Sequence, residues 1–307
     1  MKLQKTIKDE IELQGVGLHN GKKVNLILKP SEANSGIIFK RVDLDSPKNI
    51  IEANYKNVSE PVLCTKIKNS YGVTISTIEH LMAAFYGEGI DNVLVEIDAP
   101  EIPIMDGSAF DFVDAIRSVG VEEQKVLRKF IKVLKKVELK EGQKYISIEP
   151  LDNDLIIDFE IVYKNPLIRT RRKEFKLSKS DLNSIYNSRT FCLYEDIDKI
   201  VSLGLAKGGS LQNAIVVNDN KILNDDGLRY RDEFVSHKIL DCLGDLMLVG
   251  NRIFGHIKTS QGGHQLTNSL LRKFMDDKSN WEIEILDDKN KNSNKDNNFI
   301  KPVAVNA

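Results

Sequence analysis

Three segments carry side chains whose types and spacing suit hydrolytic chemistry. In SHKILDCLGDL, His237 and Asp241 are four residues apart within a pattern that predicts a helix, so both side chains leave one face. Such a pair could supply two ligands to a metal ion, and Asp245 lies one turn further along that face. A solvent-exposed polar stripe would have the same spacing, and this segment alone favours that simpler interpretation.

The segment STIEHL places Glu79 directly before His80. His80 could be a third ligand, and Glu79 a base beside the metal. Ser76 and Glu79 also have the spacing of a capping box, in which Glu79 would only stabilise a helix start. In QGGHQLTN, His264 follows two glycines that permit close approach of a ligand, but an ordinary turn histidine fits equally well.

Two histidines and one aspartate together suit Zn²⁺ with an open position for water. Glu79 and His264 would then supply the base and the acid of metal-assisted hydrolysis. The sequence lacks H-E-x-x-H, the P-loop motif, G-x-S-x-G and the Rossmann glycine fingerprint. Their absence argues against the common zincin, nucleotide-hydrolase, serine-hydrolase and dehydrogenase classes.

The composition limits the remaining classes of function. The chain has 307 residues, with 44 Lys and Arg against 45 Asp and Glu, and this near-zero charge argues against a protein that coats nucleic acid. No apolar run approaches the roughly 20 residues of a membrane span, and the charged opening stretch excludes a secretory signal. Three widely separated cysteines without a C-x-x-C pair suit a reducing cytoplasm.

The elements that must position these side chains fall into two successive halves. Strand-like alternation begins at Val24, Leu26 and Leu28, and a fresh set of strands begins with KYISIEP and LIIDFEIVY. Strands followed by helices favour an α+β fold over alternating βαβ units. Helices are expected over 77–86 (ended by Gly87), 108–119, 180–188, 236–249 and 266–276, with an irregular glycine-rich stretch over 204–209.

We expect an N-terminal α+β domain over residues 1–125, which carries Glu79 and His80, and a C-terminal α+β domain over 126–286. The low-complexity segment 287–307 is expected to be a solvated tail, because its Asp, Lys, Asn and Ser content cannot bury apolar area. The stretch 164–179 has seven basic residues and one acidic residue. It is either a protected edge strand or a site for phosphates or an anionic membrane surface.

With these segments laid out, the chain resembles the UDP-3-O-acyl-N-acetylglucosamine deacetylases, the zinc amidases of lipid A biosynthesis. The resemblance covers most of residues 5–275 and favours the metal-site interpretation. It implies two similar domains, each a β-sheet layered with a pair of α-helices, and an active site at the domain interface. The matching stretches are QGVGLHNGKKVNLILKP, STIEHLMAAFYGEGIDNVLVEIDAPEIPIMDGSAFDFV, SRTFCLYEDI, GLAKGGSLQNAIVVND, DGLRYRDEFVSHKILDCLGDL and GGHQLTNSLL.

The resemblance also implies roles for single residues. The zinc ligands would be His80, His237 and Asp241. Glu79 would be the general base, and His264 a cationic acid oriented by Asp245. Thr190 would donate a hydrogen bond to the developing oxyanion, a contribution of about 2.7–4 kcal/mol. Substrate contacts are expected from Lys238, His19, Leu18, Cys64, Tyr163 and Phe191, and an acyl passage from Leu18, Phe191, Ile197, Leu203 and Leu211.

Within that set, Cys64 is expected to pack near the site rather than to act as a nucleophile, and Tyr163 to stack on uracil. The expected reaction is hydrolysis of the acetamide of UDP-3-O-acyl-N-acetylglucosamine, the committed step of lipid A biosynthesis. Zn²⁺ is the expected cofactor, with Fe²⁺ a second candidate, because a His₂Asp site accepts both ions. Two alternatives stay open: a zinc deacetylase of another acylated amino sugar, and a catalytically silent nucleotide-sugar or lipid binder.

The resemblance further implies a cytoplasmic protein of a Gram-negative-type bacterium. We expect a monomer that binds a UDP-sugar lipid and no nucleic acid. Because the substrate carries a lipid chain and no membrane span is expected, peripheral contact with the inner membrane would bring the two together. The basic stretch 164–179 is the candidate for that contact.

Overall fold

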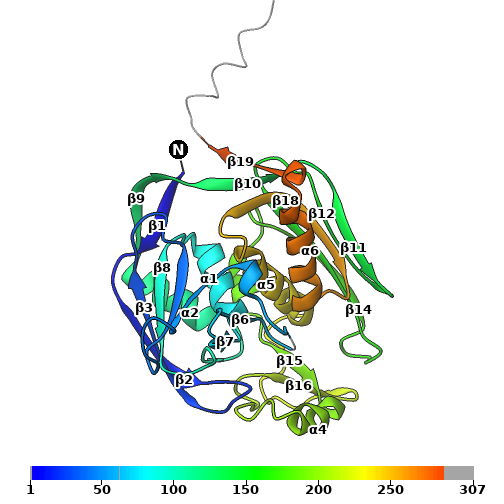
Figure 1. The fold of residues 1–307 in the computed structure, drawn as a ribbon. Helices are drawn as coiled ribbons and strands as arrows, with labels where there is room; N and C mark the ends of the chain where they lie inside the picture. The colour runs from blue at the N-terminus through cyan, green and yellow to red at the C-terminus, as the bar shows by residue number, and fades with distance from the viewer. Residues whose placement is uncertain (1, 62, 287–307) are drawn as a thin grey trace, which may run out of the picture.

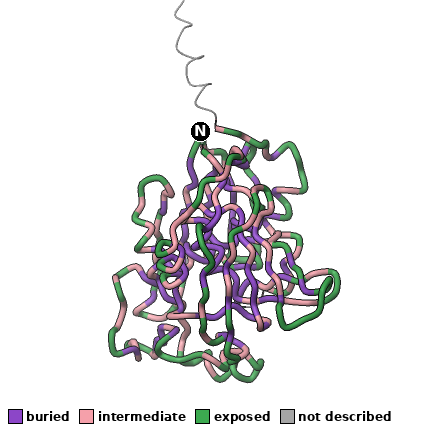
Figure 2. The backbone as a smooth tube through the Cα atoms, turned by 90° about the vertical axis from the view of Figure 1, so that its left-hand side faces the viewer, coloured by how far each residue is buried: buried purple, intermediate pink, exposed green. Residues whose placement is uncertain are grey.

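The computed structural model describes residues 2–61 and 63–286. The tail predicted over 287–307 lies outside the described residues. Buried residues gather in the interior of the trace, and exposed residues follow the surrounding loops and outer strands (Figure 2).

A five-stranded sheet dominates the N-terminal half of the fold, with its strands in the order β2-β3-β8-β4-β5. Val24, Leu26 and Leu28 alternate with more exposed residues along β3, which confirms the pattern predicted from the sequence. The sheet and its helices comprise β2 (Ile11–Val16), β3 (Lys23–Pro30), β4 (Ile37–Arg41), β5 (Ile50–Glu52), β8 (Val93–Ile97), α1 (Glu79–Glu88) and α2 (Phe110–Val119). Before α1 come the one-turn η1 (Tyr55–Asn57) and the paired β6 (Lys66–Lys68) and β7 (Thr74–Ser76).

A seven-stranded sheet dominates the C-terminal half. Its strands are β10 (Lys129–Val133), β11 (Val137–Glu141), β12 (Lys144–Glu149), β13 (Leu155–Val162), β14 (Thr170–Lys176), β18 (Arg252–Ser260) and β19 (Trp281–Ile285). The helices α5 (Glu233–Met247) and α6 (His264–Asp276) accompany it, and the one-turn η2 (Lys278–Asn280) precedes β19.

The two sheets share one order of strands. In the first sheet a hairpin, β2-β3, lies beside β8, and β4 runs parallel to β8 on its other side. In the second sheet the hairpin β11-β12 lies beside β18, and β13 runs parallel to β18. In each half, one helix precedes the central strand and another follows it. The mixed α+β class predicted from the sequence is confirmed.

Among the contacts that join the halves, a strand pairing and a helix packing position the site. Strand β1 (Leu3–Ile7) pairs with β9 (Val121–Leu127), and only Arg128 separates β9 from β10. Helices α1 and α5 pack directly against each other between the two sheets (Figure 1). The residues at the start of α1 therefore lie beside the face of α5.

The first helix differs from its expected bounds. It ends not at Gly87 but two residues later, at Gly89, whose φ of 82° is left-handed. Gly87 lies inside the helix, and the absence of a side chain there makes room for the phenol of Tyr186. At the other end the cap is Ile78, without a side-chain cap, so the capping-box interpretation of Ser76 and Glu79 is wrong.

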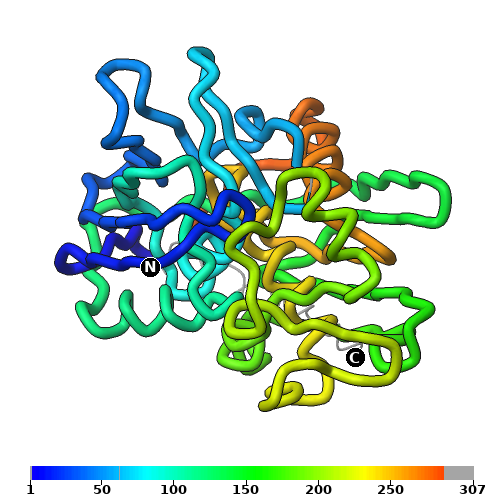
Figure 3. The backbone as a smooth tube through the Cα atoms, turned by 90° about the horizontal axis from the view of Figure 1, so that it is seen from below, coloured from blue at the N-terminus to red at the C-terminus, as the bar shows by residue number. Residues whose placement is uncertain are grey.

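The segment between β14 and α5 adds short helices and a three-stranded sheet of its own. It holds α3 (Leu182–Tyr186), β15 (Phe191–Leu193), α4 (Tyr194–Ser202), β16 (Ile215–Asn218) and β17 (Lys221–Ile222), of which α4 was not expected from the sequence. The loop after α4 lies along the loop between β2 and β3, since the Gly208 N–H donates to the Leu18 carbonyl at 3.0 Å (Figure 3). This segment therefore lies against the β2–β3 loop of the N-terminal sheet.

Candidate active site

The three predicted metal ligands come together from two helices. His80 is the second residue of α1, and His237 and Asp241 lie one turn apart on α5. The Nε2 atoms of His80 and His237 lie 3.5 and 3.4 Å from Oδ1 of Asp241. All three side chains are buried, and one ligand atom of each lies within 4.8 Å of the others.

The surroundings of these three side chains fit a divalent cation. Nδ1 of His237 donates to the carbonyl of Ser188 at 3.0 Å, which leaves Nε2 free as a ligand. Oδ2 of Asp241 accepts from Nζ of Lys238 at 2.8 Å, whereas Oδ1 has no hydrogen-bond partner among the described residues. A buried carboxylate oxygen without a partner, between two imidazole nitrogens, suits a metal with N and O ligands.

The protonation states of His237 and Asp241 suit the binding of a metal ion. Burial lowers the pKa of His237 to about 3, so its ring is neutral near pH 7. Burial opposes the charged form of Asp241, but His237 and Lys238 outweigh it and hold the pKa of Asp241 well below its ordinary value. Neutral imidazole and ionised carboxylate are the forms that bind metal.

Glu79 and His264 face each other beside this cluster. Oε1 of Glu79 lies 3.6 Å from Nε2 of His264, and Nδ1 of His264 donates to Oδ2 of Asp245 at 2.8 Å. Burial raises the pKa of Glu79, which suits a general base. Burial also disfavours charged His264, but the carboxylates of Asp245 and Glu79 prevail and raise its pKa to about 10. The pair therefore offers a carboxylate and a cationic donor side by side.

Two cavities meet at this cluster. A small polar cavity of about 30 Å³ is bordered by the metal-ligand trio, Glu79, His264 and Thr190. A larger cavity of about 870 Å³ shares Thr190 and His264 with it. Leu18, His19, Leu63 and Lys238 also line both cavities.

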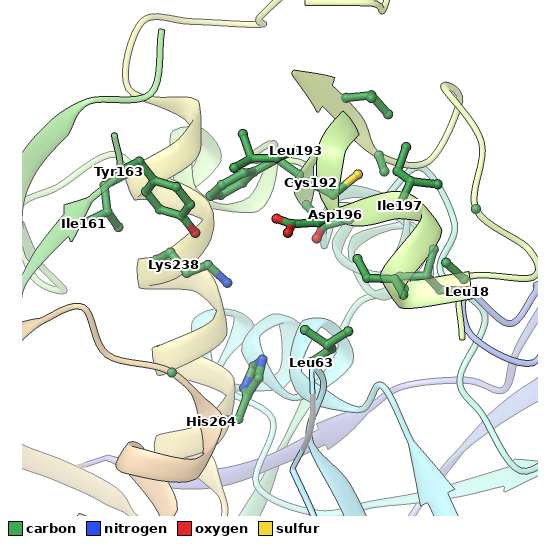
Figure 4. A pocket seen from close by; sticks show the side chains of 18 of the residues that line it. Leu18, Leu63, Ile161, Tyr163, Cys192, Leu193, Asp196, Ile197, Lys238 and His264 are labelled. Carbon is green, nitrogen blue, oxygen red and sulfur yellow. The ribbon is translucent and has the colours of Figure 1, made fainter. Parts of the chain in front are cut away.

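The larger cavity gathers most of the residues predicted to contact substrate. Tyr163, Lys238 and His264 lie on one side of it, and Leu18 and Ile197 on the other (Figure 4). Phe191 and Leu211 also line it, and the rings of Tyr163 and Phe191 meet edge to face at 5.7 Å. Ile161 lies beside Tyr163 and Asp196 lies near Ile197, so both sides of the cavity carry apolar and polar side chains (Figure 4).

Two predicted contacts fall outside the cavities. Cys64 is buried and lines neither of them, and burial raises the pKa of its thiol to about 12. Its position agrees with the packing interpretation and not with a direct substrate contact. Leu203 is 62 % exposed beyond the end of α4 and is absent from the lining, so its expected place in the passage is wrong.

The basic stretch 164–179 contains the edge strand β14, whose one strand partner in the described part of the chain is β13. Arg172 forms an ion pair with Asp158, and the guanidinium groups of Arg169 and Arg171 donate to nearby backbone carbonyls. These contacts agree with the edge-strand alternative. Within residues 2–61 and 63–286, no helix is long and apolar enough to span a membrane.

The site also contains residues that the sequence did not single out. Thr65 touches Glu79, Asp245 and His264, and Ser188 orients His237 through its backbone carbonyl. A threonine among ordinary loop residues and a backbone atom give no signal in a single sequence. Only the fold brings them to the cluster.

Comparison with known proteins agrees with this geometry. Residues 4–276 match the LpxC family, described as UDP-3-O-acyl N-acetylglycosamine deacetylase. A UDP-3-O-acyl-N-acetylglucosamine deacetylase of Actinobacillus succinogenes is 45 % identical over 291 residues, 94 % of this chain and 95 % of the relative. Proteins of the same description from Pasteurella multocida and Pseudoalteromonas translucida are each 45 % identical, over 93 % and 91 % of this chain and 94 % and 92 % of theirs.

The fold and the site have the features of a metal-dependent hydrolase, since three buried potential metal ligands lie beside a carboxylate and a cationic histidine. The matched family specifies the reaction within this class of hydrolases, namely deacetylation. The chain belongs to the family of UDP-3-O-acyl-N-acetylglucosamine deacetylases, the zinc hydrolases of lipid A biosynthesis.

Proposed function

We propose that this chain removes acetate from UDP-3-O-acyl-N-acetylglucosamine with zinc held by His80, His237 and Asp241. The observation that carries the proposal is the meeting of these three side chains with Glu79 and His264 at one small polar cavity. When bound there, zinc would supply a Lewis acid and lower the pKa of water to about 7. Fe²⁺ is a second candidate because the ligand set accepts it.

In this proposal Glu79 is the general base. Its Oε1 takes the proton of the attacking water, while its Oε2 is held by the backbone N–H of Thr65 at 3.0 Å. His264 is the cationic acid that gives a proton from Nε2 to the departing amine, and Asp245 fixes its orientation from Nδ1. The raised pKa of His264, about 10, keeps that proton available near pH 7.

Thr190 is proposed to stabilise the oxyanion that forms on the acetamide carbonyl. Its backbone is fixed on both sides, by hydrogen bonds to Gly107 and from Ile215, each of 2.8 Å. Because the backbone N–H of Thr190 is already used, the donor would be its hydroxyl, which this fixed backbone holds at the cavity. Thr190 also lines both cavities, as this role requires.

The larger cavity is proposed to hold the rest of the substrate. Its volume of about 870 Å³ and the apolar residues Leu18, Ile197 and Leu211 suit a fatty acyl chain. Lys238, with Tyr163 and Phe191 nearby, would contact the phosphates, the sugar or the uracil. His19 also faces this cavity and has no side-chain hydrogen bond among the described residues.

We also infer that the chain consists of two similar domains, 1–125 and 126–286, with the active site between them. The shared strand order of the two sheets and the packing of α1 on α5 support this division. From the family we further infer a cytoplasmic monomer in a Gram-negative-type bacterium. Peripheral contact with the inner membrane through 164–179 has weaker support, because three of its arginines are engaged within the chain.

The test is acetate release from UDP-3-O-acyl-N-acetylglucosamine by the purified protein, before and after removal of metal with a chelator. Activity should disappear and return with one equivalent of Zn²⁺. Glu79→Gln should keep full zinc content and lose about 10²–10⁴-fold in kcat. His237→Gln should lose both zinc from this site and activity, whereas His256→Gln, in β18 and in a separate group with Asp158 and Glu174, should keep activity.

No turnover by folded, zinc-loaded protein would overturn the proposed substrate. It would favour the deacetylase of another acylated amino sugar or the silent binder. Wild-type turnover by Glu79→Gln would instead overturn the proposed role of Glu79.

A further inference from the structure

Thr65 is the one described residue that hydrogen-bonds Glu79, Asp245 and His264. It immediately precedes β6, is only 1 % exposed, and lies 180 and 199 residues along the chain from Asp245 and His264. Its backbone is tied to the start of α1, because its N–H donates to Oε2 of Glu79 at 3.0 Å and its carbonyl accepts from Ile78 at 3.4 Å. Its side chain is tied to the other half of the chain.

The hydroxyl of Thr65 has its donor and acceptor roles fixed by its neighbours. A carboxylate can only accept, so the hydroxyl donates to Oδ1 of Asp245, 2.5 Å away. Its lone pairs then remain free to accept, and Nδ1 of His264 lies 3.0 Å from the same oxygen. The N–H at Nδ1 is therefore shared between Thr65 and Oδ2 of Asp245, which lies at 2.8 Å.

The two acceptors at Nδ1, the Thr65 hydroxyl and Oδ2 of Asp245, determine which proton His264 can give away. A proton must stay on Nδ1, so the proton that His264 gives away is the one on Nε2, which faces Glu79 at 3.6 Å. At the same time, the Thr65 N–H donates a hydrogen bond to Oε2 of Glu79. The other carboxylate oxygen, Oε1, is then the one that faces Nε2 of His264. One residue thus orients both groups that exchange protons with the substrate.

We propose that Thr65 is a positioning residue that keeps the Nδ1–H tautomer of His264 and aligns it with Glu79 across the two halves of the chain. This inference rests on the proposed function, because it assigns Thr65 to the base and the acid named there. A simple buried hydroxyl would contribute to stability alone. The positioning role requires a loss of kcat without a loss of zinc.

The test compares Thr65→Val, which removes only the hydroxyl at nearly constant shape, with Thr65→Ser, which keeps it. Thr65→Val should lower kcat about 10–100-fold, the usual effect of losing an outer hydrogen-bond partner, with KM and zinc content unchanged. Thr65→Ser should recover most of kcat. Thr6→Val removes another buried hydroxyl, that of Thr6 in β1, which accepts from the backbone N–H of Ser31, and this variant should leave kcat unchanged.

A spectroscopic measurement separates positioning from stability. In zinc-loaded protein with ¹⁵N-labelled histidine, the Nδ1–H signal of His264 can be assigned by its loss in His264→Asn, since the chain has five histidines. This signal should shift or exchange faster with water in Thr65→Val and be restored in Thr65→Ser. Thr6→Val should leave it in place.

The results distinguish failure of this inference from failure of the proposed function. Wild-type kcat and an unchanged Nδ1–H signal in Thr65→Val, while Glu79→Gln is inactive, would overturn the role of Thr65 alone. Full activity of Glu79→Gln would overturn the proposed mechanism itself. If Thr65→Val does not fold, Thr65→Ala and Thr65→Ser serve instead, and equal kcat in those two variants would reject the inference.

Discussion

Gly244 of α5 lies directly against the backbone of Glu79 at the start of α1. A Cβ built at Gly244 would overlap the carbonyl oxygen of Glu79 and lie 2.9 Å from its carbonyl carbon. This close approach sets the distance between the helix that carries Glu79 and His80 and the helix that carries His237 and Asp241. The absence of a side chain at Gly244 is therefore a condition for assembling the cluster.

Gly244→Ala should push α1 away from α5 and separate the two sets of ligands. We expect a loss of about 1–3 kcal/mol in the free energy of unfolding, as for other overpacked interiors, and a lower zinc affinity. The matched control is Gly87→Ala, which would overlap Tyr186 away from the ligands. Urea unfolding measures the free energy of unfolding of both variants, and zinc titration measures their zinc affinity. Equal zinc affinity in the two would show that the α1–α5 distance does not control the site.

The charge on His264 should make the stability of the zinc-free protein depend on pH. The pKa of this histidine is raised to about 10 in the fold, against about 6.5 in an unfolded chain. A raised pKa stabilises the fold fully below pH 6.5, and this contribution is lost as pH rises towards 10. The free energy of unfolding should therefore fall over that interval, and fall less in His264→Gln. Parallel pH curves for the two proteins in urea unfolding would contradict the assignment.

The part of the site that sequence could predict is the part set by local spacing. His237 and Asp241 share a helical face because they are four residues apart, and the structure places Asp245 one turn further. His264 was expected in a turn before a helix, but it is the first residue of α6. Local patterns thus located the side chains but not the start of α6.

The rest of the site depends on contacts between distant parts of the chain. Thr65 reaches Asp245 across 180 residues, and nothing in its own segment distinguishes it from a loop threonine. Gly244 reads as an ordinary helical glycine until α1 is packed on it. Tertiary packing, not propensity, decides both. The helix α4 is a different case, because Ile197, Ile200 and Val201 have the i, i+3, i+4 spacing of a helix and the local pattern could have predicted it.

The cavity wall offers a test of where the acyl chain lies. Ile197→Trp should fill part of the 870 Å³ cavity, because Ile197 lines it. Displacing about two CH₂ groups of the acyl chain, at ~0.8 kcal/mol each, would lower kcat/KM for the long-chain substrate roughly tenfold. A short-chain substrate should be little affected. Leu203→Trp is the matched control, since Leu203 is exposed and outside the lining. Measurements of kcat/KM against acyl length in both variants show whether the acyl chain lies beside Ile197. An equal loss for long and short chains in Ile197→Trp would place the acyl chain elsewhere.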